Sequence, residues 1–292
     1  MMMMRTITRF QKLALIGGAG SLFLFYNSSV SPITHRRYLN LFGDDLREFG
    51  SKFLMKAILS PFPSVPQSES AEPKNNRELL TSVVVQHFLQ GKEVSRTFPA
   101  YDKLDEIASR LVENNPELHL SQPKIHISVD GRVPAFSLAD HIVISLNTLL
   151  TCSETQIAFI LGHEMAHNAL DHHAVALSLK IVDLMTFGVT IAMVPRKLLL
   201  ALFWFVFNPL KPMMIFPVMR SAENEADELG LKMVVKAGYE ENISEVLKMW
   251  DQLEKKNPTP AWYHYFTDHP TLKHRKQRME QQIVDILNNS EQ

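Results

Sequence analysis

The sequence of 292 residues predicts a mainly helical α+β fold, in which a helical core carries a small β-sheet. Apolar residues recur at helical spacing in several segments after residue 96, whereas only two short segments have the pattern of strands. Hydrophobic residues make up 46% of the chain and charged residues 21%, which is enough for a packed core. We therefore place the folded domain at residues 96–292.

The charge and cysteine content exclude several classes of protein. Thirty Lys and Arg side chains nearly balance 31 Asp and Glu side chains, so the basic surplus typical of a nucleic-acid-binding protein is absent. Cys152 is the only cysteine, which excludes an intramolecular disulfide and a thiolate metal site. Any bound metal must therefore be held by carboxylates and by some of the 12 histidines.

The first half of the domain is predicted to contain one helix and two strands. Apolar residues at helical spacing in 104–112 predict a helix, and the Asn-Asn-Pro sequence at 114–116 ends it. Residues 123–130 alternate apolar and polar side chains, as a half-buried strand does, and end on an Asp-Gly turn signal. Residues 140–146 are the second strand candidate.

Four helices are predicted in the second half of the domain. They cover residues 154–172, 221–238, 242–255 and 271–287. Ser153 followed by Gln156 matches a capping box at the start of the first of these helices. Gly238 is a suitable terminator for the second, because glycine readily adopts the left-handed conformation that ends many helices.

The segment 1–30 is basic and apolar. Asp44 is the first acidic residue of the chain, and residues 13–26 are almost wholly apolar. This combination fits a mitochondrial presequence, a cleaved signal peptide or a marginal membrane anchor, although no clear small-x-small cleavage site follows the apolar run. We therefore treat 1–30 as a targeting or membrane-anchor segment. Residues 61–95 are predicted to form a linker, rich in Pro, Ser and Glu, followed by a helix.

Residues 181–219 form a hydrophobic insert in the domain. The insert contains the run LLLALFWFVF at 198–207 and only four charged residues. Its four prolines divide it into pieces that are too short to span a bilayer simply. A buried core hairpin is one interpretation of the insert. We prefer a helical hairpin that dips into the membrane, because so many aromatic side chains are difficult to bury in a small domain.

Residues 163–167 have the sequence His-Glu-Met-Ala-His, an H-E-x-x-H motif. On a helix, His163 and His167 lie one turn apart on the same face, so both imidazoles can reach one tetrahedral zinc ion. Glu164 can point at the fourth coordination position and act as general base towards a water molecule. A chance pentapeptide is the alternative, but the motif falls on a helix that the capping box predicts independently.

Two carboxylates at helical spacing follow the insert. A catalytic zinc site needs a third protein ligand, and two histidines with one glutamate are an established set, so Glu223 is the candidate. Asp227, one turn further on, can accept a hydrogen bond from the distal nitrogen of a ligand histidine. Without the upstream motif, such a pair would more often be a solvated acidic face.

These motifs together resemble the gluzincin metallopeptidases of the CAAX-protease and HtpX type. In that family an H-E-x-x-H helix precedes an E-x-x-x-D helix that carries the third ligand. The resemblance extends to residues 31–37 and 134–138 and to a late H-P-x-x-x-x-R motif, although His35 and Pro134 replace the usual Gly and Asn. It covers residues 31–60, an N-terminal family segment, and residues 96–280. The hydrophobic insert resembles the branch of mitochondrial inner-membrane peptidases whose activity overlaps that of an AAA protease.

The resemblance implies a metalloendopeptidase with one zinc ion per chain. It implies protein substrates that are associated with or tethered to a membrane, and a place in quality control and stress response at the mitochondrial inner membrane. Contact with the lipid bilayer and assembly into homo-oligomers are further expectations from the same resemblance.

The resemblance also implies roles for three residues outside the ligand set. His269 is expected to approach the zinc and either to stabilise the oxyanion or to block the water position, although a structural histidine before Pro270 fits equally well. Arg220 is expected to order the acidic cluster. His172 is expected to support the ligands from outside, although a polar residue near a helix end fits the same position.

The sequence leaves open both where a substrate binds and whether the chain is a membrane peptidase, a scaffold or a secreted enzyme. Ile142, Val143 and Ile144 are predicted to line an exposed strand edge that pairs with an extended peptide, yet an ordinary strand is equally consistent. A membrane scaffold or chaperone with a structural metal would need a fourth protein ligand. A secreted or periplasmic endopeptidase would have its apolar start removed.

Overall fold

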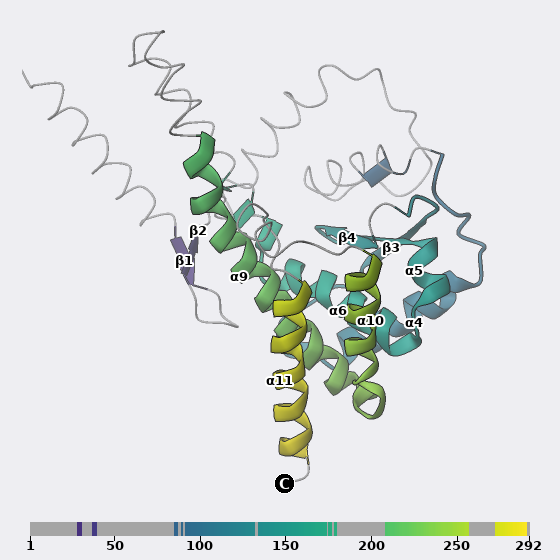
Figure 1. The fold of residues 1–292 in the computed structure, drawn as a ribbon. Helices are drawn as coiled ribbons and strands as arrows, with labels where there is room; N and C mark the ends of the chain where they lie inside the picture. The colour runs from purple at the N-terminus through teal and green to yellow at the C-terminus, as the bar shows by residue number, and fades with distance from the viewer. Residues whose placement is uncertain are drawn as a thin grey trace, which may run out of the picture.

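The computed structural model describes residues 28–30, 37–39, 91–131, 134–173, 208–256 and 272–290, with positions 85, 86, 89, 175, 176, 178 and 179. Residues 1–27, most of the hydrophobic insert and His269 lie outside the described residues. The described part is mostly helical with one small mixed sheet, so the predicted α+β class is confirmed (Figure 1).

Most of the described helices overlap segments for which the sequence predicts a helix, whereas the short helix at residues 146–151 is not predicted. The helices are α4 (Ala100–Glu113), α5 (Leu146–Thr151), α6 (Glu154–Ala169), α9 (Asn208–Val234), α10 (Glu245–Lys256) and α11 (Leu272–Ser290), with short turns η1 (Pro116–Leu118), η3 (Val235–Tyr239) and η4 (Glu240–Asn242). Helix α9 runs diagonally across α6, while α10 and α11 pack against this pair on one side and α4 on the other (Figure 1).

Two antiparallel strands and one three-stranded sheet make up the β-structure. The strands are β1 (Ser28–Val30), β2 (Arg37–Leu39), β3 (Lys124–Ser128), β4 (Ala135–Leu138) and β5 (His141–Ser145). β1 pairs with β2, and the larger sheet has the order β3-β5-β4, with β5 parallel to β3 and antiparallel to β4. The strands predicted at 123–130 and 140–146 are therefore confirmed, with β5 ending where α5 begins.

The prediction that Ile142, Val143 and Ile144 form an exposed edge is wrong. These residues belong to β5, which is the central strand and is hydrogen-bonded on both sides. Their side chains are buried, because Ile142 and Ile144 enter the main core and Val143 packs against Val85 and Leu89 on the opposite face. A short apolar run looks the same in sequence at the centre of a sheet and at its edge.

Helix α6 is fixed at its start by side-chain hydrogen bonds. The Ser153 hydroxyl accepts from the Gln156 backbone N–H, and the Gln156 side chain accepts from the Ser153 N–H at 3.0 Å, so the predicted capping box is confirmed. The Gln156 amide also donates to the backbone carbonyl of Glu245 on α10 at 2.8 Å. Leu161 and Met165 then anchor the helix in the core.

Helix α9 is longer than predicted. It begins at Asn208 instead of near Ser221, so the last part of the hydrophobic insert forms its first turns. Pro209 lies in the first turn, where a backbone N–H has no helical partner, and Pro217 removes one hydrogen bond without ending the helix. The helical path ends as expected near Gly238, which has a φ of 80° in η3.

No described helix is both long and apolar enough to cross a membrane. The membrane anchor predicted at 1–30 and the hairpin predicted at 181–219 lie mostly outside the described residues, and both stay predictions.

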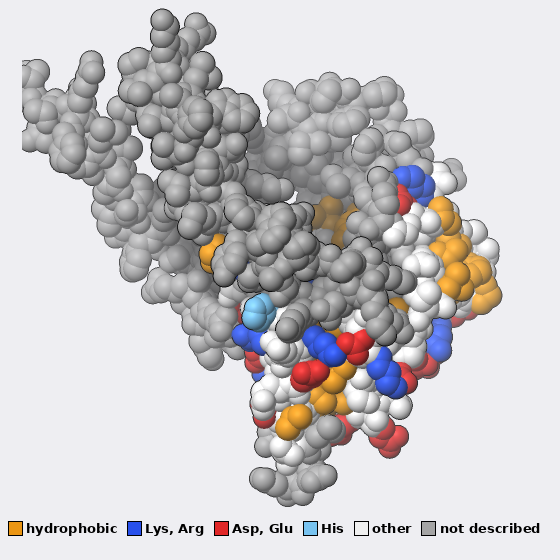
Figure 2. Space-filling model, viewed as in Figure 1, with side chains coloured by type: hydrophobic (Ala, Val, Ile, Leu, Met, Phe, Trp, Pro, Cys, Tyr) orange, Lys and Arg blue, Asp and Glu red, His pale blue; other side chains and the backbone are white. Residues whose placement is uncertain are grey.

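The described surface shows acidic and basic side chains interspersed over one part and hydrophobic side chains gathered at another edge (Figure 2). The most exposed large hydrophobic residues are Leu150 on α5, at 74%, and Val129 after β3, at 57%.

The crossing of α6 and α9 is close enough that each helix presents a glycine to the other. A Cβ atom added to Gly230 would lie 2.8 Å from the backbone N of His163 and 3.0 Å from its Cα. A Cβ atom added to Gly162 would lie 3.1 Å from the carbonyl oxygen of Gly230. The two backbones are therefore almost in contact, and no larger residue fits at position 230 without moving one helix.

We predict that Gly230→Ala destabilises the protein although alanine favours helices. Overpacking should cost about 1–3 kcal/mol, and the helix propensity of alanine should offset no more than about 1 kcal/mol of this. Gly131→Ala is the matched control, because its new Cβ would meet only the Cβ of Asn147 at 3.8 Å. Urea unfolding measures both variants, and an unchanged stability of Gly230→Ala would contradict the tight crossing.

Candidate metal centre

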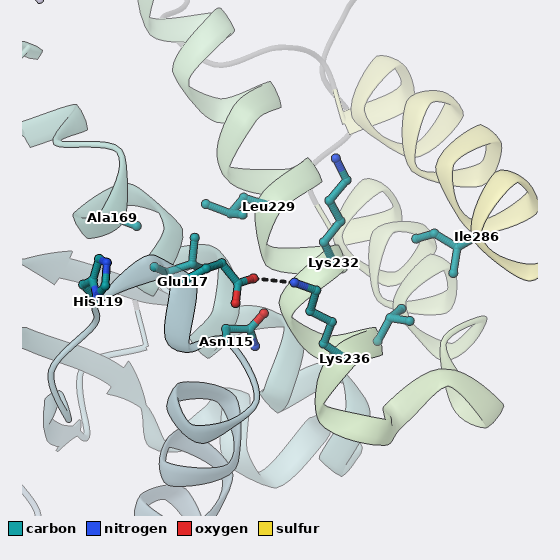
Figure 3. A pocket seen from close by; sticks show the side chains of 10 residues that line it. Asn115, Glu117, His119, Ala169, Leu229, Lys232, Lys236 and Ile286 are labelled. Carbon is teal, nitrogen blue, oxygen red and sulfur yellow. Dashed lines mark hydrogen bonds and ion pairs between the residues drawn. The ribbon is translucent and has the colours of Figure 1, made fainter. Parts of the chain in front are cut away.

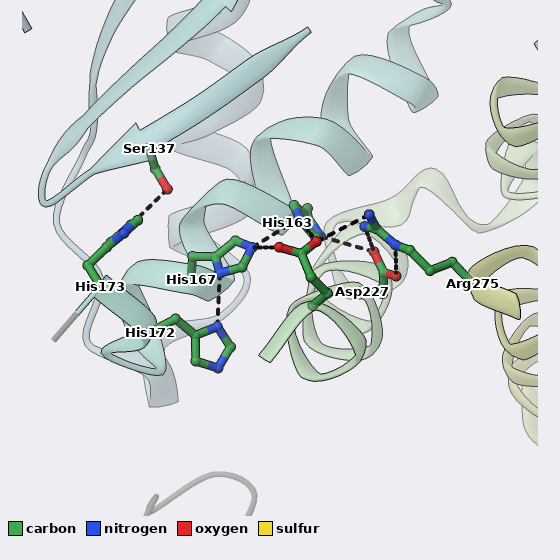
Figure 4. Close-up of polar contacts among 8 residues, drawn as sticks. Ser137, His163, His167, His172, His173, Asp227 and Arg275 are labelled. Carbon is green, nitrogen blue, oxygen red and sulfur yellow. Dashed lines mark hydrogen bonds and ion pairs between the residues drawn. The ribbon is translucent and has the colours of Figure 1, made fainter. Parts of the chain in front are cut away.

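Two histidines on α6, labelled in Figure 4, and one glutamate on α9 converge at the helix crossing. The Nε2 atoms of His163 and His167 lie 3.1 Å apart. Oxygens of the Glu223 carboxylate lie 3.6 Å from Nε2 of His163 and 3.7 Å from Nε2 of His167. Within the described residues, this is the one group of three potential ligands whose atoms all lie within 4.8 Å of one another.

These separations fit a tetrahedral metal ion. Bonds of about 2.0–2.1 Å to zinc place two tetrahedral ligand atoms about 3.3 Å apart, which is close to the observed 3.1, 3.6 and 3.7 Å. Two imidazoles and one carboxylate also match the donor set of many catalytic zinc sites, in which solvent takes the fourth position. The three residues that the sequence proposes as ligands are thus brought together.

Asp227 holds one of the ligand rings in place. Its Oδ1 atom lies 3.0 Å from Nδ1 of His163. A carboxylate only accepts hydrogen bonds, so this contact favours a proton on Nδ1 and leaves the lone pair of Nε2 directed at the ligand group. The structure therefore places Asp227 where the sequence expects it, one turn after Glu223.

His172 makes the equivalent contact to the second ligand ring. Helix α6 ends at Ala169, and Asp171 turns the chain back with a φ of 54°. Nδ1 of His172 consequently lies 2.9 Å from Nδ1 of His167. Burial and the neighbouring His173 lower the pKa of His172 to about 4. His172 is therefore neutral near pH 7, and its Nδ1 lone pair can accept a hydrogen bond from Nδ1–H of His167.

Arg275 on α11 is the cation that neutralises the acidic pair, and no role at the site is predicted for it from the sequence. Its Nε and Nη2 atoms donate to the two Asp227 oxygens at 2.7 and 2.6 Å. Its Nη1 atom lies 3.2 Å from Glu223, and the guanidinium stacks 4.4 Å above the Trp250 ring. Two carboxylates that face a buried metal site need a counter-charge. Arg275, the last residue of the late H-P-x-x-x-x-R motif, supplies it.

Burial and neighbouring charges shift the pKa values of the carboxyl and imidazole groups of the site in opposite directions. Burial works to raise the pKa of Asp227, but Arg275 and His163 outweigh it and bring that pKa to about 2. Burial raises the pKa of Glu164, against the opposing effects of His163 and a hydrogen bond from Ser137. Burial and the adjacent His163 hold the pKa of His167 well below its usual value. A carboxyl of raised pKa beside a neutral histidine is a common feature of catalytic sites.

The roles expected of Arg220 and His269 stay predictions. Arg220 lies on α9 one turn before Glu223 and is partly exposed, whereas the guanidinium that contacts Glu223 and Asp227 belongs to Arg275. His269 lies outside the described residues, so its approach to the metal stays a prediction.

A separate cavity of about 610 Å³ lies beside the ligand helices, where η1, α9 and α11 meet (Figure 3). Leu118, Leu229 and Val235 give it apolar walls, and an ion pair between Glu117 and Lys236 lies at its rim. None of the three candidate metal ligands lines this cavity. The metal centre is therefore defined by the converging side chains and is not part of this cavity.

A helix that carries an H-E-x-x-H motif crosses a helix that carries Glu223 and Asp227. This arrangement defines a metallopeptidase domain. A model of peptidase family M48 matches residues 101–283, and the chain belongs to that family. The metallopeptidase resemblance carried by the motifs is thereby confirmed.

The curated relatives are mitochondrial metalloendopeptidases. The chain is 26% identical over 275 residues to the mitochondrial metalloendopeptidase OMA1 of Bos taurus, covering 91% of this chain and 48% of the relative. The proteins of the same name from Homo sapiens and Danio rerio are each 24% identical, over 275 and 282 residues; both matches cover 91% of this chain, with 48% and 52% of the relatives. The chain thus spans about half the length of the relatives it matches.

We predict that Arg275→Met strongly destabilises the metal-free protein. The substitution keeps a long side chain over Trp250 but leaves Asp227 buried without its cation, which typically costs about 3–5 kcal/mol. The neighbouring Lys276→Met is the control, because Lys276 pairs with the half-exposed Asp251 and should contribute no more than about 1 kcal/mol. Equal urea-unfolding midpoints and slopes for the two variants would refute this role of Arg275.

We also predict that part of the acid sensitivity of the metal-free protein comes from Asp227. Its pKa falls from 3.8 to about 2 on folding. The contribution to stability is therefore complete above pH 4 and is lost as the pH falls towards 2, and it amounts to about 2 kcal/mol. Unfolding free energies of the wild type and Asp227→Asn, measured between pH 5 and 2, should converge as the pH falls. Parallel curves would be the contrary result.

Proposed function

We propose that the chain is a zinc-dependent metalloendopeptidase that holds one zinc ion with His163, His167 and Glu223. The convergence of these three side chains at ligand distances carries the proposal. Membership of peptidase family M48 supports it. A scaffold with a structural metal is less well supported, because a structural zinc site has four protein ligands and the described residues bring three together.

The proposed reaction is the attack of water on a peptide carbonyl. When bound, zinc supplies a Lewis acid for the water and the carbonyl oxygen. Glu164 lies on α6 beside the first ligand and is largely buried. Its carboxylate takes the proton of the attacking water and passes it to the leaving amine, and its raised pKa suits both transfers. Asp227 and His172 keep the two imidazoles turned towards the metal throughout.

Among the described strands, β4 is an edge strand of the three-stranded sheet, and we infer that an extended substrate pairs with it. In the sheet order of the described strands, β4 has one neighbour, β5, and its other edge is not paired with a strand. β4 also packs against α6, the helix that carries Glu164. A peptide that added to this edge would place its backbone beside the general base.

The proposed place of action is the mitochondrial inner membrane. The relatives are named mitochondrial metalloendopeptidases, and the chain has a basic, acid-free start and a long hydrophobic insert. We infer membrane-tethered protein substrates, contact with the bilayer, homo-oligomers and a role in quality control and stress response. These features support a membrane enzyme over a secreted or periplasmic one.

We predict that Glu164→Gln abolishes proteolysis while zinc stays bound. The ligand set is untouched, so the zinc content of the purified full chain should remain one per chain, as measured by metal analysis. Loss of the general base should slow cleavage of a labelled unfolded protein by about 10²–10⁴-fold.

The matched control for this variant is Glu154→Gln on the same helix. Glu154 is 45% exposed and pairs with Lys103 at 2.9 Å, so the control should cleave like the wild type. Chelation of the metal should stop cleavage in both the control and the wild type. Wild-type rates in Glu164→Gln would rule out the assigned base, and a metal-free but active wild type would rule out the zinc mechanism.

A further inference from the structure

We propose that the cavity between η1, α9 and α11 is a second binding site, which takes a single-chain lipid phosphate with a free hydroxyl beside the phosphate, such as a lysophosphatidate. This site is independent of the proposed peptidase reaction, because none of the three candidate metal ligands lines the cavity. Three features of the cavity support it: a buried amide whose oxygen is directed inward, the apolar walls, and the charges at the rim.

Asn115 presents a fixed hydrogen-bond acceptor to the cavity. The residue is 2% exposed, and its Nδ2 atom donates to the backbone carbonyls of Leu111 at 2.8 Å and of Met233 at 3.2 Å. These two bonds use both N–H groups of the amide, so its orientation is fixed. Its Oδ1 atom is directed towards Glu117 and Lys236 (Figure 3), and within the described part of the chain it accepts no hydrogen bond. Because a buried acceptor without a donor is costly, a hydroxyl or N–H group of a ligand fits this position.

The walls of the cavity are apolar and come from several elements. Leu118 of η1, Leu229 of α9, Val235 of η3 and Ile286 of α11 line it, as does Ala169 at the end of α6. Its volume of about 610 Å³ lies within the range of about 300–1,000 Å³ that is typical of small-molecule sites. In such sites apolar walls bury the body of the ligand and a few polar groups orient it. A single acyl chain therefore suits these walls.

The rim of the cavity carries two lysines and one acid. Lys232, Lys236 and Glu117 are the charged lining residues. Glu117 and Lys236 form an ion pair, and both side chains are about half-exposed, so an incoming anion can take the place of Glu117 at little cost. Lys232 pairs at 2.8 Å with Glu228, which is not a lining residue. The rim thus favours a ligand with a negatively charged head.

The acceptor and a lysine lie close together, and this proximity selects the kind of head group. Asn115 is hydrogen-bonded to the carbonyl of Met233, three residues before Lys236. A head group must therefore offer a donor and an anion on neighbouring atoms. An ionised fatty acid offers acceptors only. A lysophosphatidate has a hydroxyl on the carbon atom next to the one that carries the phosphate, so it can donate to Asn115 and accept from Lys236 at the same time.

A lipid in this cavity would contact both helices that carry the candidate metal ligands. Leu229 directly precedes Gly230, where α9 crosses α6, and Ala169 lies two residues after His167. The bound chain would pack beside the crossing without touching the ligand side chains. Binding to the folded chain should consequently raise its unfolding temperature, by mass action, whether or not a metal is present.

The test uses lauroyl lysophosphatidate with a photoactivatable diazirine in its acyl chain. It is added to the purified full chain with a chelator present, so that no metal-dependent cleavage occurs. Mass spectrometry should place the crosslinks on lining residues such as Leu118, Leu229 and Ile286. Competition by unlabelled analogues then measures each part of the ligand. The analogue without the hydroxyl should bind about 3–10-fold more weakly, as expected for one hydrogen bond, and glycerol 3-phosphate, which has no acyl chain, should not compete.

Two variants at the half-exposed rim should act in opposite directions. Lys236→Met should lower the affinity for lauroyl lysophosphatidate by about 2–5-fold, and Glu117→Gln should raise it by a similar factor because it removes a competing carboxylate. Neither variant should change the binding of monolauroylglycerol, which lacks the phosphate. Lys248→Met is the matched control, because Lys248 is exposed on α10 and does not line the cavity.

The contrary results are separable. Crosslinks outside the cavity, or equal affinities of Lys236→Met, Glu117→Gln and the wild type, would refute the site and reveal general partitioning of an amphiphile. Equal competition by the analogue without the hydroxyl would refute the role of Asn115. Tighter binding of N-lauroylglycine, which has an N–H group and a carboxylate, would overturn the assignment of a lipid phosphate. Failure of zinc-dependent cleavage would refute the proposed peptidase function alone, since lipid binding is measured without metal.

Discussion

The near-contact of two helix backbones at Gly162 and Gly230 is the constraint on which the metal centre depends. The two candidate histidine ligands lie on α6 and the candidate carboxylate ligand lies on α9, so the distance between the helix axes sets the distance between the ligand atoms. Glutamate and histidine side chains are short compared with the diameter of a helix. The crossing leaves no room for a Cβ atom at position 230 and brings Glu223 within 3.7 Å of both imidazoles.

This close crossing creates an electrostatic problem that α11 resolves. Glu223 and Asp227 are drawn into a largely buried place one turn apart, where two uncompensated carboxylates would be costly. Arg275 reaches both of them and is itself held over the Trp250 ring of α10. Helices α10 and α11 are therefore parts of the metal centre, although neither supplies a candidate ligand among the described residues.

The parts of the fold and site that could be predicted from the sequence are those set by local spacing. The capping box placed the start of α6, the motif placed His163 and His167 on one face, and the E-x-x-x-D spacing placed Glu223 and Asp227. Long-range relations could not be predicted in this way. The position of β5 at the centre of the sheet, the pairing of Arg275 with Asp227 and the contact of Ser137 with His173 join segments that are distant in the chain. Periodicity within one segment carries no information about them.

The outer contacts explain how the ligand rings keep one orientation. Each imidazole can turn either nitrogen inward, and a metal alone would accept either. Asp227 holds Nδ1 of His163 and His172 holds Nδ1 of His167, so Nε2 faces Glu223 in both cases. The two supports differ in charge, because one is a carboxylate and the other a neutral imidazole. His163 is therefore the more electron-rich of the two candidate ligands and the one on which a proton competes more strongly with a metal ion. Binding of a metal there would consequently release a proton chiefly from His163.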